Sequence, residues 1–129
     1  MKENAALEMF VSLKQFVLWD VSPSHSQLLM RHRESDGNNV DIVFVGVFFM
    51  QIPRLFRGLK LEIAPSDQAE AIFEEIGWTR NSNHRKAGTK RIFRITSDGR
   101  AYYLGAVGWR VDRNSLGPRE SSLEIPGTT

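Results

Sequence analysis

The stretch SQLLMRHR, residues 26–33, alternates in a way that predicts a β-strand. Leu28 and Met30 fall on one face, with His32 at its polar end, and the intervening residues fall on the opposite face. An Asp-Gly pair follows at residues 36–37, and this pair favours a hairpin turn. The strand is therefore expected to reverse direction and to pair with the residues after the turn.

The next stretch, residues 40–52, is apolar on both faces after Asp41. This pattern predicts a central strand that is covered from both sides. Gly46 lies inside it and indicates a bulge or a close approach of another backbone. Shorter runs predict two more strands, at residues 15–20 and 59–63, and residues 1–14 fit neither the helical nor the strand period.

Residues 66–76 predict the one helix of the chain. Asp67 and Glu70 have the spacing of a capping box, and Gly77 is a typical terminator. The apolar positions recur at helical spacing, at Ala69, Ile72, Phe73 and Ile76. This apolar stripe is expected to pack against the sheet.

After the helix, residues 79–90 are polar, basic and without a period, which predicts a long loop. A second hairpin follows over residues 91–111, with its turn at another Asp-Gly pair, residues 98–99. The sequence beyond Leu116 predicts a tail.

Together these elements predict an α+β fold in a single domain over residues 1–116. About six strands joined mainly by hairpins are expected to form a mostly antiparallel sheet, with the helix at about 66–76 packed on it. Residues 117–129 are expected to form a flexible C-terminal tail.

Composition removes several kinds of chemistry. The chain of 129 residues contains no cysteine, so a disulfide framework, a thiolate zinc site and a cysteine nucleophile are all excluded. The longest apolar run, residues 42–50, is too short to span a bilayer, and the N-terminus lacks a continuous apolar run of signal-peptide length. We expect a cytoplasmic protein that needs neither a membrane nor a cofactor.

The stretch SPSHSQ places His25 between two serines and invites a catalytic or metal-binding interpretation. His25 and His32 are separated by an odd number of positions, which sends them to opposite faces of a strand. No G-x-S-x-G elbow and no H-E-x-x-H spacing accompanies them. We therefore interpret Pro23 and its neighbours as a turn, predict no metal site and no catalytic residues, and keep a Ser/His hydrolase as a remote alternative.

Charge is distributed unevenly although the net charge is only +2. Residues 1–79 hold 7 Lys and Arg against 11 Asp and Glu, whereas residues 80–119 hold 10 against 2. Such opposite segments can neutralise each other within one fold, pair between copies in a homo-oligomer, or attract an acidic partner.

The basic third of the chain is the strongest lead to function, and it predicts binding to an acidic protein surface. The predicted binding residues are Arg80, Arg85, Lys86, Lys90, Arg91, Arg94 and Arg110. Aromatic residues interleave with these cations, so RNA or single-stranded DNA is the alternative partner, although the signature of an RNA-recognition sheet is missing.

The predicted layout, a hairpin-rich sheet with one helix in a short chain without cysteine, resembles that of many small bacterial domains, some of which act by binding another protein. Toxin-neutralising immunity proteins are among them. The resemblance lies in the architecture and assigns a function to no residue. It implies a non-enzymatic binding module of an immunity-like or adaptor-like kind.

Overall fold

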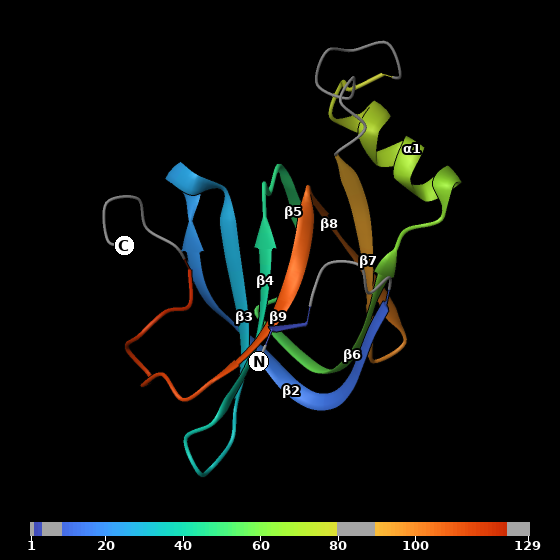
Figure 1. The fold of residues 1–129 in the computed structure, drawn as a ribbon. Coiled ribbons are helices and arrows are strands. Elements are labelled where there is room, and N and C mark those ends of the chain that lie inside the picture. Colours follow the sequence, from blue (N-terminus) through green and yellow to red (C-terminus); the bar gives the residue numbers. More distant parts are fainter. Residues whose placement is uncertain (1, 4–8, 80–89, 124–129) are drawn as a thin grey trace.

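A computed structural model describes residues 2–3, 9–79 and 90–123. Within these ranges nine strands form one mostly antiparallel sheet with a single α-helix beside it (Figure 1). The fold class agrees with the prediction, but the strand count exceeds the expected six. The strands are β1 (Lys2–Glu3), β2 (Met9–Ser22), β3 (Gln27–Arg33), β4 (Asn39–Val45), β5 (Phe49–Gln51), β6 (Leu55–Ile63), β7 (Arg91–Ser97), β8 (Arg100–Ala106) and β9 (Gly108–Asn114).

Two of the three extra strands arise where predicted strands bend, and the third is β1, within residues 1–14, for which the sequence predicted no element. The run predicted at 40–52 divides into β4 and β5 at Gly46, whose φ of 65° belongs to the left-handed region that favours glycine. A Cβ built on Gly46 would lie 2.5 Å from Cγ2 of Val107. The sequence predicted a bulge or a close approach of another backbone here, and the closest contact is with the side chain of Val107, whose backbone nitrogen lies 3.4 Å away.

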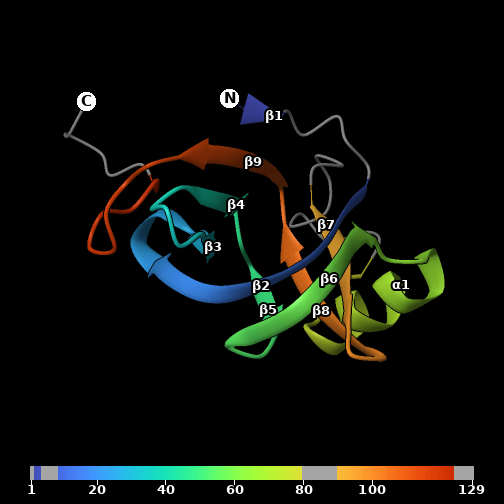
Figure 2. The same ribbon diagram turned by 90° about the horizontal axis from the view of Figure 1, so that it is seen from below.

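The second arm of the last hairpin bends opposite Gly46, between β8 and β9. β4 pairs with β9 and β5 pairs with β8, so the two bent runs stay side by side around the corner. Each of the other runs also has a neighbour on both sides, because β2 pairs with β3 and β6, β3 with β4, and β7 with β6 and β8. The sheet thus closes on itself, as Figure 2 shows, with corners made by bent strands.

The inner face of the closed sheet forms the main core. The alternation predicted for residues 26–33 is confirmed, because Leu28 and Met30 belong to this interior core whereas Leu29 packs with a separate outer cluster. Phe44 and Trp109 face each other across the β4–β9 pair and are also buried in the interior core. Successive side chains along a strand therefore point alternately into the interior core and toward the outer face of the sheet.

The helix α1 (Ser66–Glu75) lies outside the closed sheet and packs against β7, as the sequence predicts (Figures 1 and 2). Ile72 and Phe73 are buried there in a second outer cluster, together with Ile92 of β7. The expected capping box does not form, because Pro65 occupies the N-cap and no side chain caps the helix. The helix thus begins at Ser66 and keeps Asp67 inside its first turn, where a carboxylate favours the positive end of the helix dipole.

The C-terminal segment, residues 115–123, crosses the outer face of β3, β4 and β9. Leu123 is buried there against Leu29 and Val43. The backbone carbonyl oxygen of Leu116 accepts hydrogen bonds from Arg33 and Asn39. Residues 117–123, expected from the sequence to begin a flexible tail, are therefore held on the sheet, and residues 124–129 lie outside the described chain.

Candidate functional site

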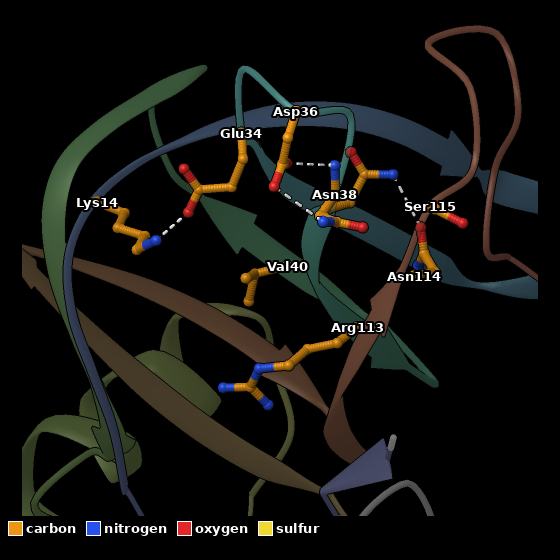
Figure 3. A pocket seen from close by; sticks show the side chains of 9 residues that line it. Lys14, Glu34, Asp36, Asn38, Val40, Arg113, Asn114 and Ser115 are labelled. Atoms are coloured by element: carbon orange, nitrogen blue, oxygen red, sulfur yellow. Dashed lines mark hydrogen bonds and ion pairs between the residues drawn. The ribbon is translucent and has the colours of Figure 1, made fainter.

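A polar pocket of about 580 Å³ opens at the end of the closed sheet, beside the β3–β4 turn (Figure 3). β2 supplies Lys14, the turn supplies Glu34 and Asp36, and β9 supplies Arg113. Val40 lines the same pocket from β4. The pocket therefore combines both signs of charge, which suits a polar ligand.

The two acidic side chains of this pocket already have partners. The Glu34 carboxylate pairs with the Lys14 ammonium group and lies 3.3 Å from Nε2 of His32, and both contacts lower the pKa of Glu34. Asp36 accepts hydrogen bonds from the backbone N–H and the side-chain amide of Asn38, which lower its pKa. The Glu34 contact joins the β3–β4 turn to β2, and the Asp36 contacts hold the turn itself, so both acids have a structural role.

His25 and His32 lie at opposite ends of β3, and His84 lies outside the described residues. His32 lies on the inner side of β3, where its ring contacts Phe16 and its Nδ1 lies 2.8 Å from the carbonyl oxygen of Gln15. His25 belongs to the short 3₁₀ turn η1 (Pro23–His25) at the other end of β3, about 20 Å away along a strand that rises about 3.3 Å per residue. The turn expected at Pro23 is confirmed.

Metal chemistry has no support in the described ranges. Among residues 2–3, 9–79 and 90–123, no group of three His, Asp or Glu side chains is arranged to hold a metal ion.

The four predicted binding residues that the structure describes do not gather on one surface. Arg94 lies on the outer face of β7 and donates hydrogen bonds to Glu62 and Gln68. Arg110 lies on β9 beneath the C-terminal segment, where it donates to the carbonyl oxygen of Ser122. Lys90, just before β7, holds its ammonium group over the ring of Trp78. The next residue, Arg91, is exposed. Arg80, Arg85 and Lys86 lie outside the described residues.

The aromatic residues interleaved with these cations are mostly turned away from solvent. Phe93 and Trp109 are buried in the interior core. Tyr102 packs against the same core, and the Tyr103 hydroxyl donates a hydrogen bond to Gln68 of α1. Stacking on nucleic-acid bases needs exposed rings, so this arrangement does not favour the nucleic-acid alternative.

A buried ion pair, which was not predicted from the sequence, lies under the C-terminal segment. Arg31 donates two hydrogen bonds to Asp41, at 2.7 and 2.9 Å, and both side chains are inaccessible to solvent. Arg31 also donates to the backbone carbonyl oxygen of Glu120, and Asp41 accepts from Ser122. The signal in the sequence was Asp41 in an apolar strand, which the hairpin register places directly opposite Arg31.

The outer face of the first half of β2 carries a row of exposed apolar side chains. Met9 is 50% exposed, Val11 61% and Leu13 96%. The intervening Phe10 points inward, where its ring contacts Trp109. We call Met9, Val11 and Leu13 the β2 row. Residues 1–14 fit neither the helical nor the strand period, so the sequence did not predict this row.

Basic side chains border the β2 row on the neighbouring strand. Lys60 of β6 lies directly across from Val11, and Arg57 lies across from Gln15. Both are exposed. Glu62, across from Met9, is engaged by Arg94, 3.0 Å away, and by Lys60, 3.8 Å away. This outer face therefore combines apolar side chains with an excess of positive charge.

Comparisons with known proteins give no relative: no family model, curated protein or solved structure matches this chain. In the described parts of the chain, no helix is long and apolar enough to cross a lipid bilayer.

Proposed function

We propose that this chain is a non-enzymatic protein-binding module that holds an acidic partner on the outer face of β2 and β6. The observation that carries the proposal is the β2 row, three large apolar side chains that are at least half exposed on one strand face. Exposed apolar residues gathered on one face of a folded domain are typical of interaction sites. Desolvation of this row supplies the affinity.

The charges around the row select the partner. Arg57, Lys60 and Arg94 lie on the same outer face as the row, and on the described parts of β6 and β7 they face one carboxylate, that of Glu62. A partner with carboxylates around an apolar centre complements this pattern, because opposite charges steer association and fix orientation. Of the binding residues predicted from the sequence, Arg94 thus extends the proposed surface. Lys90 and Arg91 come before Arg94 in the chain, at the start of β7.

A photo-crosslinking amino acid at position 11 tests the proposal directly. In extract from the native cell, crosslinks at Val11 should identify one protein, whereas the same amino acid at Val107 should not capture it. Val107 is a matched control because it is an apolar residue, 40% exposed, at the bend between β8 and β9.

Binding of the purified partner is then measured by calorimetry. We expect Val11→Ser and Leu13→Ser each to weaken the dissociation constant about tenfold or more, as for central apolar interface residues, and Val107→Ser to change it less than about twofold. Lys60→Glu should weaken binding and reduce its dependence on salt.

Three results would contradict the proposal. The first is equal capture from positions 11 and 107. The second is crosslinking of the chain to itself with no other protein, which would assign the row to a homo-oligomer. The third is tight binding of single-stranded RNA that weakens steeply with salt. Such a salt dependence comes from contacts with phosphates, so it would identify RNA as the partner in place of an acidic protein.

A further inference from the structure

A second, mostly apolar pocket of about 310 Å³ lies at the opposite end of the closed sheet from the polar pocket. It opens between the β2–β3 turn and β5. The lining residues are Val21, Ser22, Pro23, Ser26, Gln27, Val47, Phe48, Phe49 and Met50. Its volume is at the small end of the roughly 300–1,000 Å³ typical of ligand pockets and suits one large side chain.

The pocket exists because β3 covers only part of its neighbour. β3 pairs with β4 as far as the Gln27–Val45 pair. Ser26 then adopts the left-handed conformation, with φ of 53°, and its carbonyl oxygen accepts a hydrogen bond from the backbone N–H of Val47. The chain turns away there, and among the described strands β5 pairs with β8 alone.

The uncovered edge of β5 carries no charged side chain that would block strand addition. Proteins commonly protect such edges with charged side chains. Phe49, Met50 and Gln51 carry no charge, and Met50 is 46% exposed. An uncharged strand edge therefore lies next to an apolar pocket.

We propose that β5 and this pocket bind an extended peptide segment, which adds to the sheet as a strand beside β5. In this mode the backbone of the peptide pairs with the free edge of the strand, and one side chain enters a neighbouring pocket. The apolar lining selects a large apolar side chain, such as Leu or Phe. The surface is separate from the β2 row, so the inference goes beyond the proposed function and does not depend on it.

Charge near the end of β5 defines the peptide further. Arg100 lines a shallow hollow together with Gln51 and Pro53, and both Arg100 and Arg54 are exposed. This hollow lies at the C-terminal end of β5, beside the first residues of β8. Because a strand rises about 3.3 Å per residue, an acidic residue about three positions from the apolar side chain would reach these arginines.

Selection of peptides on the full chain tests the inference. A displayed library of random octapeptides is panned against the wild-type protein, and peptides that also bind Ser22→Trp are discarded. Tryptophan at position 22 would fill the pocket. Ser24→Trp is the matched control, because Ser24 is an exposed residue of the same turn and does not line the pocket.

The selected peptides should combine a large apolar residue with a nearby Asp or Glu. In anisotropy titrations we expect Ser22→Trp to weaken their binding at least about tenfold and Ser24→Trp less than about twofold. Arg100→Ala should weaken the acidic peptides several-fold and leave variants with Asn or Gln at the acidic position unchanged. Amide shifts in nuclear magnetic resonance spectra should concentrate in η1 and β5.

Other outcomes would overturn the inference. These are a library that yields nothing above the Ser22→Trp background, selected peptides that are basic, and amide shifts confined to the β2 row. Amide shifts at β5 that depend on protein concentration without any peptide would assign the edge to a second copy of the chain. Because the β2 row is tested with substitutions at positions 11 and 13, failure of either proposal can be told from failure of the other.

Discussion

The Arg31–Asp41 pair shows how one residue can serve several parts of the fold at once. Arg31 reaches Asp41 across the hairpin, the ring of Trp19 from β2, and the carbonyl oxygen of Glu120 in the C-terminal segment. A buried ion pair of this kind adds little net stability relative to apolar residues, but its geometry is costly to break. Its role is therefore to fix where the C-terminal segment lies.

Removal of one partner should be more harmful than removal of both. We expect Asp41→Leu to lower the free energy of unfolding by about 3–5 kcal/mol, because the Arg31 guanidinium stays buried without its counter-charge. The double variant Arg31→Met/Asp41→Leu should recover at least half of that loss. Urea denaturation of both variants measures the difference, and equal destabilisation would contradict this account.

At the scale of elements, strand bends and the C-terminal segment decide which side chains reach solvent. β2 shifts its register between Ser12 and Gln15 where it pairs with β6. Leu13, within this irregularity, is the most exposed residue of the β2 row. At the opposite corner, Gly46 lets the β4–β5 run bend and so exposes the edge of β5. Both proposed binding surfaces thus depend on irregular points in otherwise regular strands.

The C-terminal segment should come off the sheet as a unit. Leu123→Ala removes its one buried apolar anchor among the described residues, so the amides of residues 117–123 should exchange hydrogen faster, while those of β7 and β8 keep their rates. The matched control is Arg119→Ala, because Arg119 is exposed. Hydrogen exchange followed by mass spectrometry provides the measurement, and uniform acceleration across the protein would contradict local release.

At the scale of the whole molecule, the inner face of the closed sheet forms the main core, and separate segments cover parts of its outer face. The helix covers part of the outer face at β7, and the C-terminal segment covers part at β3 and β4. The β2 row lies outside both covered regions (Figures 1 and 2). Exposure of that row is thus a property of the assembled fold.

Acid should destabilise the whole molecule partly through the β3–β4 turn. The pKa values of Glu34 and Asp36 are lowered in the folded state. Groups with lowered pKa values stabilise the fold above their unfolded pKa, about 4, and lose that contribution as the pH falls through the folded value. We expect the urea concentration at the unfolding midpoint to decrease as the pH is lowered below about 4.

The double variant Glu34→Gln/Asp36→Asn should show a shallower fall with acid than the wild type, because it lacks both titrating groups. Unfolding by urea at a series of pH values between about 2 and 7 measures this effect. An unchanged acid dependence would show that other carboxylates account for it.

Much of the fold could be predicted from the sequence, because the signals involved are local. The two-residue period of residues 26–33, the Asp-Gly turns and the helical spacing of Ile72 and Phe73 each lie within one element. The candidate sites could not be predicted in the same way. The cations chosen by sequence, such as Arg94 and Arg110, are close in the chain but lie on different outer surfaces.

The sequence alone determined six of the strand runs, the turns between them and the helix, because each follows from the conformational preferences and apolar spacing of neighbouring residues. Only the tertiary structure decided that the sheet closes, that Arg31 and Asp41 are buried, and that the β2 row and the β5 edge stay exposed. These properties depend on which strands and segments lie side by side. Pairing between residues far apart in the chain sets that arrangement, and no local period encodes it.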